Sequence, residues 1–316
     1  MNWRALGKTD LQVSALGLGT VQLGLPYGIG LPDPPSDREC IELLHHALDA
    51  GINYFDTAPV YGRSEELLGK AFGPVTPKPI IATKVIIKGH PDAASLQGAT
   101  PRQQLEESVI SSLKRLGLEA LDLLQIHSAE AAYMGPKLLE AMDDLSSRGL
   151  VRYWGATTYG ETNAMDVLAL PGSFHTLQVA YSMLDQRQEK KVFPCCREQG
   201  TGLVLRSVFL KGVLSGRALD LPSELSGLRR EALKANQIAA SAGMDLPELA
   251  LRFATFCPYA HTTLFGTTSI AETQANLAAV KKGPLPQEVL EQLNNLRVND
   301  EQLLHPVYTT TGWAIS

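Results

Sequence analysis

Cysteine is scarce in this sequence, and the few cysteines present form no metal or disulfide pattern. None belongs to a Cys-x-x-Cys pair; they are Cys40, Cys195, Cys196 and Cys257. Free thiols of this kind are typical of a reducing cytosol. His45 and His46 are consecutive and would point apart on a helix, so they form a poor metal pair. The sequence therefore predicts no disulfide framework and no metal, and it favours a cytoplasmic protein.

Clusters of basic residues and long apolar runs are also lacking. The net charge of −5 over 316 residues argues against a nucleic-acid partner. No apolar run approaches the ~18 residues that a membrane helix needs. The first four residues lack the apolar core of a signal peptide. We therefore expect a small-molecule partner, no nucleic acid and no membrane, with a monomer and a homo-oligomer both left open.

What the chain does have is a regular alternation of strand-like and helix-like segments. A β-hairpin is predicted over residues 3–15, around the turn Gly7-Lys8-Thr9-Asp10. Strands are predicted at 16–20, 53–56, 79–84, 122–127, 151–156, 176–181, 203–207 and 262–265. Helices are predicted at 37–50, 64–72, 100–116, 136–148, 161–170, 186–199, 228–242, 246–256, 270–280 and 287–298. Residues 22–36 and 211–227 resemble long loops, and the tail 304–316 is left unassigned.

About eight strand–helix units indicate an α/β protein with a parallel sheet covered by helices. That number predicts closure into a (β/α)8 TIM barrel, a single domain over residues 1–316 with an N-terminal β-hairpin and extra C-terminal helices. The alternative is a doubly wound sheet, which would usually carry a glycine fingerprint. Gly17 and Gly19 do not form one, because the next glycine is Gly24 and no helix is expected to begin there.

Polar residues stand at the ends of three consecutive predicted strands. Asp56, Lys84 and His127 occupy these ends, and Tyr61 follows Asp56 by five residues. The carboxyl ends of barrel strands meet at one mouth, so the four side chains are expected to converge. A cationic Lys84, with Asp56 as its counter-ion, is expected to lower the pKa of Tyr61. The sequence thus predicts Tyr61 as a general acid/base.

A neutral His127 would orient a carbonyl oxygen beside this acid. The set lacks a nucleophile and a metal, so it needs a hydride source, and a nicotinamide cofactor is the natural complement. One alternative is that Lys84 forms a Schiff base, as in barrel aldolases. Another is that each residue, taken alone, is an ordinary rim or packing residue. The arrival of all four at strand ends favours a site.

Several segments resemble the aldo-keto reductase family, and the likeness covers nearly the whole chain. The matching segments are 16–20, 51–58, Tyr61-Gly62, Ser64-Glu65, Thr83-Lys84 and 122–127. The resemblance implies a catalytic tetrad of Asp56, Tyr61, Lys84 and His127. It implies an NAD(P)-dependent oxidoreductase that acts on an aldehyde, a ketone, an alcohol or the C1 of a sugar, with the cofactor extended across the barrel mouth. It leaves open a cofactor-binding regulatory subunit, like the channel-associated relatives of the family.

The resemblance also implies which residues would hold the cofactor. Those near the nicotinamide are Gly19, Thr20, Val21, Asp56, Thr157, Thr158, Gln178 and Arg206. Those near the pyrophosphate are Ser207, Phe209, Gly212 and Leu214. Those near the adenosine are Gly266, Thr268, Glu272 and Asn276. Thr157 and Thr158 replace the family's Ser-Asn pair, and Arg206 stands where an aromatic residue usually stacks on the ring.

The adenosine end bears on the choice of cofactor. Members that prefer NADPH commonly place a basic residue at the position of Gly266 or Glu272 to pair with the 2′-phosphate. Glu272 would repel that phosphate and accept a hydrogen bond from a ribose hydroxyl instead. We therefore expect NAD(H) to be favoured over NADP(H). A small carbonyl or sugar substrate would be walled by Tyr27, Tyr61, His127 and Trp313.

Overall fold

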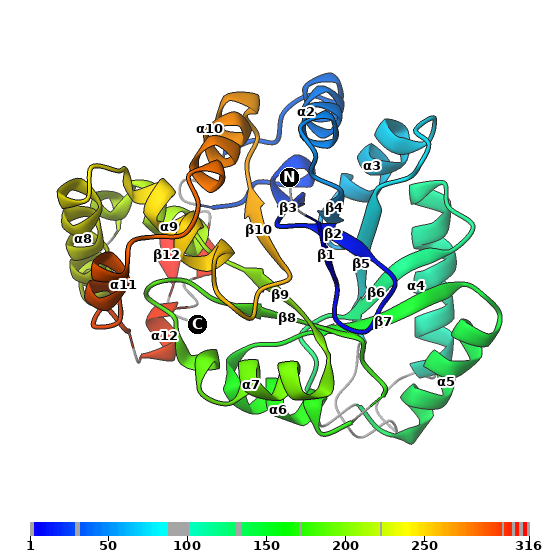
Figure 1. Ribbon diagram of the computed structural model, residues 1–316. Coiled ribbons are helices and arrows are strands. Elements are labelled where there is room, and N and C mark those ends of the chain that lie inside the picture. The colour runs from blue at the N-terminus through cyan, green and yellow to red at the C-terminus, as the bar shows by residue number, and fades with distance from the viewer. Residues whose placement is uncertain are drawn as a thin grey trace.

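Eight parallel strands form a closed barrel with helices around it (Figure 1). The computed structural model describes residues 3–28, 32–87, 101–130, 134–170, 172–221, 223–298, 300–304, 307–309 and 312–314. Around the barrel the strands follow the order β10-β3-β4-β5-β6-β7-β8-β9. Each strand therefore lies beside its neighbours in the sequence, as right-handed β-α-β units require. The predicted (β/α)8 barrel is confirmed.

The barrel strands agree with the predicted ones to within one or two residues. They are β3 (Leu16–Gly19), β4 (Tyr54–Asp56), β5 (Ile80–Val85), β6 (Leu121–Ile126), β7 (Val151–Thr157), β8 (Thr176–Ala180), β9 (Gly202–Arg206) and β10 (Thr262–Gly266). Their register decides which side chains meet at the mouth. Asp56 is level with Gly19 on β3, and Lys84 on β5 is level with Gln125 on β6.

The helices follow the strands and cover the outside of the barrel. They are α2 (Asp37–Asp49), α3 (Ser64–Phe72), α4 (Pro101–Leu116), α5 (Pro136–Ser147), α6 (Gly160–Leu168), α7 (Val192–Gln199), α8 (Ser226–Ser241), α9 (Leu246–Thr255), α10 (Ile270–Lys281), α11 (Gln287–Leu293) and α12 (Glu301–Leu304). Local signals fix several starts. Ser36 forms a capping box with Glu39 at α2, and Asp245 caps α9. Most of the apolar core lies between barrel and helices, as where Phe55 packs on Phe72.

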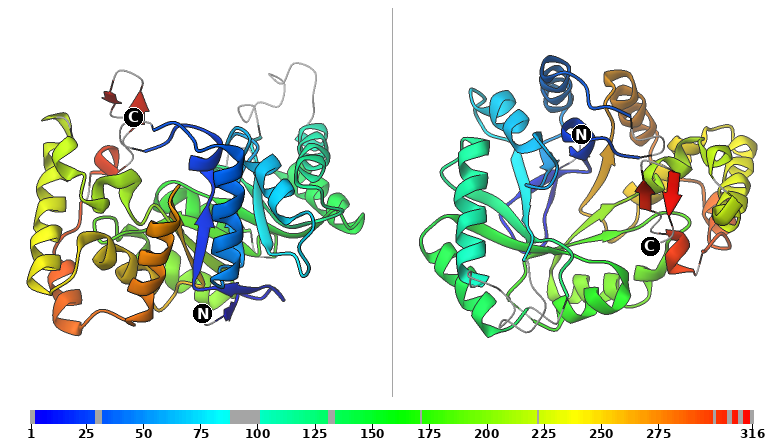
Figure 2. Two further views of the ribbon diagram at one scale, coloured as in Figure 1. Left: turned by 90° about the horizontal axis from the view of Figure 1, so that it is seen from above. Right: turned by 180° about the vertical axis from the view of Figure 1, so that it is seen from behind.

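The predicted hairpin closes the amino-terminal end of the barrel. Strands β1 (Trp3–Ala5) and β2 (Gln12–Ser14) pair antiparallel. Leu6 and Val13 are fully buried and pack in one cluster with Tyr54, Leu123 and Val204 from the barrel. At the opposite end, the tail forms a second antiparallel pair, β11 (Val307–Thr309) and β12 (Gly312–Ala314) (Figure 2). The hairpin therefore plugs one end and leaves the other for the site.

Four predicted segments differ from the structure. A one-turn helix, α1 (Val21–Gly24), begins where none was expected and runs into the segment 22–36 that was predicted as a loop. The helix predicted at 186–199 is a 3₁₀ turn, η3 (Arg187–Glu189), followed by α7, because Pro194 is tolerated only in a first turn. The predicted loop 211–227 contains three 3₁₀ turns: η4 (Leu210–Ser215), η5 (Ala218–Asp220) and η6 (Ser223–Leu225). The helix predicted to reach residue 298 ends at Leu293.

Candidate active site

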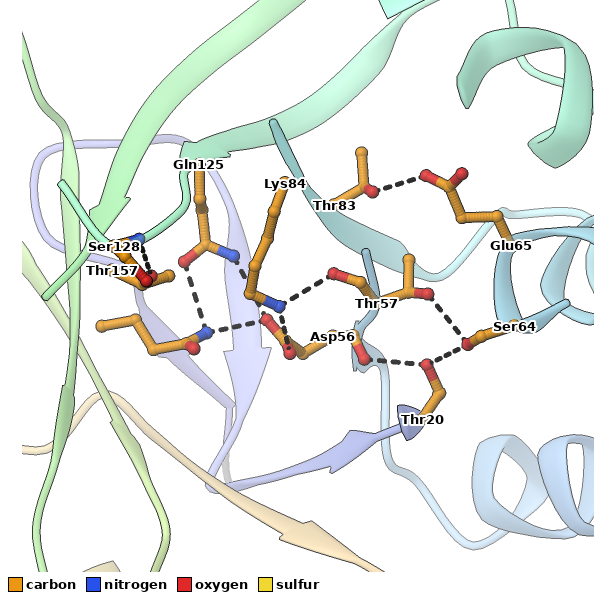
Figure 3. Close-up of polar contacts among 11 residues, drawn as sticks. Thr20, Asp56, Thr57, Ser64, Glu65, Thr83, Lys84, Gln125, Ser128 and Thr157 are labelled. Carbon is orange, nitrogen blue, oxygen red and sulfur yellow. Dashed lines mark hydrogen bonds and ion pairs between the residues drawn. The ribbon is translucent and has the colours of Figure 1, made fainter. Parts of the chain in front are cut away.

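A buried ion pair joins the ends of β4 and β5. The Lys84 Nζ donates to Asp56 Oδ2 at 2.6 Å and to the carbonyl oxygen of Thr57 at 2.8 Å (Figure 3). Lys84 is 1 % exposed and Asp56 is 4 % exposed. A cation buried this deeply needs a partner of opposite charge, and Asp56 is that partner. The predicted pairing of these two residues is present.

Tyr61 and His127 lie next to this pair. The Lys84 Nζ is 4.8 Å from the centroid of the Tyr61 ring. The rings of Tyr61 and His127 have centroids 6.4 Å apart and planes at 89°. The structure therefore brings all four predicted catalytic side chains into one cluster.

The backbone around Tyr61 is fixed by the short helix α1. A Cβ built on Gly24 would lie 1.7 Å from the carbonyl oxygen of Tyr61. Gly62 has a φ of +56°, and a Cβ there would lie 2.3 Å from the carbonyl oxygen of Gly24. Two glycines thus allow α1 and the Tyr61 loop to touch backbone to backbone. This contact fixes the backbone of Tyr61 and, through it, the position of the Tyr61 phenol.

Hydrogen bonds made by hydroxyl groups connect the strand ends around Asp56 to the start of α3. Thr20 Oγ1 donates to the carbonyl oxygen of Asp56 at 2.9 Å, and its oxygen lies 2.6 Å from Ser64 Oγ (Figure 3). Ser64 Oγ lies 2.9 Å from Thr57 Oγ1. On the next strand, Thr83 Oγ1 donates to the buried Glu65 at 2.6 Å. These bonds hold the ends of β3, β4 and β5 to the start of α3.

The electrostatics of Tyr61 differ from the sequence-based expectation. Burial raises the pKa of the Tyr61 phenol well above its ordinary value; Asp56 raises it further and Arg206 opposes the rise. Burial lowers the pKa of Lys84, and Asp56 opposes that change. The expectation of a lowered pKa for Tyr61 is wrong, because burial keeps water from the phenolate and this effect outweighs the opposing charge of Arg206. Tyr61 therefore keeps its proton at neutral pH.

His127 is also uncharged at neutral pH. Burial, and then the charge of Lys84, lower its pKa to about 4. Its Nδ1 is buried without a hydrogen-bond partner in the described parts of the chain. A neutral imidazole can donate one hydrogen bond to a carbonyl oxygen, as predicted from the sequence.

A cavity of about 570 Å³ opens over this cluster. That volume lies within the ~300–1,000 Å³ typical of small-molecule sites. The predicted site residues that line it are Gly19, Thr20, Val21, Tyr27, Asp56, Tyr61, His127, Thr157, Gln178, Arg206, Ser207, Phe209, Gly212, Gly266, Thr268, Glu272 and Asn276. Lys84, Thr158 and Leu214 do not line it; the first lies beneath Asp56 and the other two are buried. The side chain of Trp313, on β12, lies outside the described residues.

Some residues of the cavity wall were not foreseen. Tyr159 follows directly on the Thr157-Thr158 pair, and Lys211 lies inside the segment predicted for the pyrophosphate, so both had a positional signal. Arg206 lies with its guanidinium 4.6 Å from the Tyr159 ring centroid. It donates to the carbonyl oxygen of Thr158 at 3.0 Å and to Ser207 Oγ at 3.1 Å. Burial, and then Arg206, lower the pKa of Lys211 to about 8.

The wall of this cavity suits an elongated, negatively charged nucleotide. Arg206, Lys211 and Arg217 bring positive charge to one side. Gln22 also lines the cavity, and its buried Oε1 has no hydrogen-bond partner among the described residues. Gly266 leaves space beside Gln22, since a Cβ there would lie 2.3 Å from Gln22 Oε1. These features fit an amide and a phosphate group.

Other kinds of site find little support in the described residues. No group of three or more His, Cys, Asp or Glu side chains there could hold a metal ion. No helix within those ranges is long and apolar enough to cross a bilayer. A second cavity of about 530 Å³ lies by the hairpin turn and contains none of the predicted site residues.

Comparisons with known proteins agree with this geometry. Residues 15–298 match the sequence profile of the Aldo/keto reductase family. The chain is 26% identical over 316 residues to "Uncharacterized oxidoreductase YqkF" of Bacillus subtilis (strain 168), covering 96% of this chain and 99% of that protein. It is 28% identical to "Probable voltage-gated potassium channel subunit beta" of Arabidopsis thaliana, covering 90% of this chain and 93% of that one.

A solved structure shares both the fold and part of the sequence. The holo form of the aldo-keto reductase AKR11C1 from Bacillus halodurans has a TM-score of 0.77 and 27% identity, covering 95% of this chain and 97% of that one. The profile match extends over most of the chain, from the first barrel strand to beyond the last. The chain therefore belongs to the Aldo/keto reductase family of oxidoreductases, which use nicotinamide cofactors.

Proposed function

We propose that this protein transfers hydride between a nicotinamide cofactor and a small carbonyl or alcohol, with Tyr61 as the general acid and base. The observation that carries the proposal is the cluster at the cavity floor. There the buried Lys84–Asp56 pair lies against the ring of Tyr61, and the neutral His127 stands at right angles to that ring. The cluster can give a proton to oxygen, and it offers no nucleophile.

The mechanism follows from the state of each group. The Tyr61 hydroxyl and the neutral His127 donate hydrogen bonds to the carbonyl oxygen of the substrate. A nicotinamide bound in the cavity would supply the hydride for the carbonyl carbon. The substrate oxygen then becomes an alkoxide, which is more basic than a phenolate, so it takes the Tyr61 proton despite the raised pKa of that phenol. Lys84 stabilises the phenolate left behind. The reverse reaction returns the proton to Tyr61.

The residues that line the cavity would hold the cofactor along its length. Gly19, Thr20, Val21, Asp56, Thr157, Gln178 and Arg206 would surround the nicotinamide, with the buried Thr158 supporting them from behind the wall. Ser207, Phe209, Lys211 and Gly212 would lie along the pyrophosphate. Gly266, Thr268, Glu272 and Asn276 would meet the adenosine. Leu214 is buried behind this wall, where it supports the pyrophosphate segment rather than touching it.

Two features bear on the ligands that such a site selects. Glu272 lines the cavity at the first turn of α10, and Thr267 Oγ1 donates a hydrogen bond to its carboxylate. A carboxylate there disfavours a 2′-phosphate, so we infer a preference for NAD(H).

Tyr27 lines the substrate side, and burial raises its pKa to about 12, so it presents a neutral phenol. Aldehydes and the C1 of sugars fit this polar, uncharged wall, with Trp313 as a further proposed contact.

The decisive experiment combines a substrate screen with one variant. Aldehydes, ketones and sugars are tested with NADH, NADPH and their oxidised forms by nicotinamide absorbance. Tyr61→Phe removes only the phenol hydroxyl, so we expect turnover to fall by roughly 10²–10⁴-fold, the usual worth of a general acid. Cofactor binding, followed by fluorescence, should persist. Near-normal turnover in Tyr61→Phe would overturn the role given to the phenol.

A second candidate function is a cofactor-binding regulatory subunit. The similarity to a protein named as a probable potassium channel subunit favours keeping it. Tight cofactor binding by the wild-type protein without turnover of any carbonyl or alcohol would support this function over the first. A Schiff-base aldolase is disfavoured, because the Lys84 ammonium is bound by Asp56 and by the carbonyl of Thr57 and lies beneath the cavity wall. Borohydride should therefore trap no substrate on the enzyme.

A further inference from the structure

The second carboxylate oxygen of Asp56 is held by two amides. Oδ2 is paired with Lys84, whereas Oδ1 accepts from Gln178 Nε2 at 2.7 Å and from Gln125 Nε2 at 3.2 Å. The two amides also touch, since Gln178 Nε2 lies 3.3 Å from Gln125 Oε1. The buried carboxylate thus has donors on both of its oxygens.

Gln125 differs from Gln178 in its position. Gln178 lines the cavity, whereas Gln125 is 0 % exposed and does not reach the cavity wall. It stands on β6 level with Lys84 on β5 (Figure 3). On its other side Gly155 leaves the space that the side chain fills, because a Cβ there would lie 3.0 Å from Gln125 Cγ. The amide is therefore fixed in place by the barrel interior.

Without the Gln125 amide, Oδ1 would keep Gln178 as its one donor among the described residues, and the Gln178 amide would itself lose its contact with Gln125 Oε1. A buried carboxylate that loses a donor on one oxygen tends to turn toward another partner. If Asp56 turned, Oδ2 would leave Lys84, and the ammonium would lose the partner that keeps it charged beneath Tyr61. We propose that Gln125 is a positioning residue, which holds Asp56 in the orientation that pairs it with Lys84. Its effect on catalysis rests on the function proposed above; its effect on Asp56 does not.

The variant Gln125→Met tests this role, because methionine has a similar volume and lacks the amide donor. Loss of one hydrogen bond to a charged group is expected to reduce kcat roughly tenfold. The affinity for cofactor should stay unchanged, because Gln125 does not touch the cavity.

Two comparison variants separate positioning from damage to the barrel. Thr176→Val alters another buried polar residue of the barrel whose hydroxyl has no partner in the described structure, so its kcat should match that of the wild type. Gln178→Met removes the other amide, and because Gln178 lines the cavity it should change both kcat and cofactor affinity. A Gln125→Met protein with wild-type kcat would overturn the proposal.

A second readout needs no turnover. In a crystal structure of Gln125→Met, Asp56 should be turned so that Oδ2 lies beyond hydrogen-bond reach of Lys84 Nζ, more than about 3.5 Å away. An Asp56–Lys84 pair that keeps its place in the variant would overturn the proposal even if the enzyme proved inactive. Conversely, a turned Asp56 in a protein without turnover would uphold the positioning role and reject the proposed function. The two proposals therefore fail separately.

Discussion

The ammonium of Lys84 lies 4.8 Å from the centroid of the Tyr61 ring, on a strand that follows the loop bearing that ring. The positive charge faces the ring from inside the barrel, while the cavity lies on the other side of Asp56 and Tyr61. A cation in this place stabilises negative charge on the phenol without competing for the substrate. In the proposed reaction the buried pair would therefore act through Tyr61.

The first prediction concerns this pair. Lys84→Met leaves the Asp56 carboxylate buried without its counter-ion, which is expected to cost about 3–5 kcal/mol of unfolding free energy. The double variant Lys84→Met/Asp56→Asn removes both charges, so it should be more stable than the single one. Urea unfolding of the wild type and three variants, including Asp56→Asn, measures the coupling. If the unfolding free energy lost in the double variant equals the sum of the losses in the two single variants, there is no net attraction between the two residues.

Much of the fold and the centre of the site follow from the sequence. Alternating apolar strands and capped helices predicted eight units, and closure of the barrel followed from that number. Asp56, Lys84 and His127 stand at the point where each apolar run ends, so their convergence followed from the geometry of a parallel barrel. These predictions rest on local periodicity and on one rule of topology, which is why they hold.

What the sequence did not reveal depends on contacts between distant segments. Gln125 lies in the middle of a strand, and only the register of β4, β6 and β8 brings its amide to Asp56. Position 24 must be glycine because the Tyr61 backbone lies so close to it. Such a contact cannot be read from the sequence, so α1 was not predicted. The predicted direction of the shift in the Tyr61 pKa was wrong, because the extent to which this side chain is buried cannot be read from its position just beyond a strand end.

The second prediction concerns stability in acid. The pKa of His127 is about 4 in the folded protein and about 6.5 in an unfolded chain. Between these values the unfolded chain binds a proton that the folded protein does not, so stability falls as pH drops from 6.5 to 4. His127→Gln should remove roughly 2–3 kcal/mol of this fall. Urea unfolding at several pH values checks it, and an equal fall in the variant would speak against a neutral, buried His127.

The third prediction concerns cofactor choice. The wild-type protein should bind NADH more tightly than NADPH, because the Glu272 carboxylate in the cavity wall would repel the 2′-phosphate of NADPH. Glu272→Gln removes that exposed charge and should improve NADPH affinity roughly three- to tenfold, as expected for an interaction of about 1 kcal/mol. Glu288→Gln makes the same change in the first turn of α11, away from the cavity, and should alter neither affinity. A wild-type preference for NADPH in the fluorescence titration would refute this assignment.

The fourth prediction tests whether α1 positions Tyr61. Gly24 lacks a positive φ, so alanine is allowed by its backbone, and only the 1.7 Å approach to the Tyr61 carbonyl opposes the change. Gly24→Ala must push the Tyr61 loop outward, and a displacement of about 1 Å can lower kcat roughly 10²-fold. Gly69→Ala is the matched control. Its Cβ would lie 2.3 Å from the Arg115 carbonyl oxygen, so it forces a similar backbone shift between α3 and α4.

Both glycine variants are expected to lose stability, since each inserts a methyl group where backbone atoms already touch. Only Gly24→Ala should lose kcat per folded molecule, because the Gly69 clash falls on Arg115 and leaves the contact between Gly24 and Tyr61 intact. Thermal unfolding gives the folded fraction, and steady-state kinetics at a temperature where both proteins are folded gives kcat. Equal kcat in the two variants would mean that the Tyr61 loop holds its place without α1.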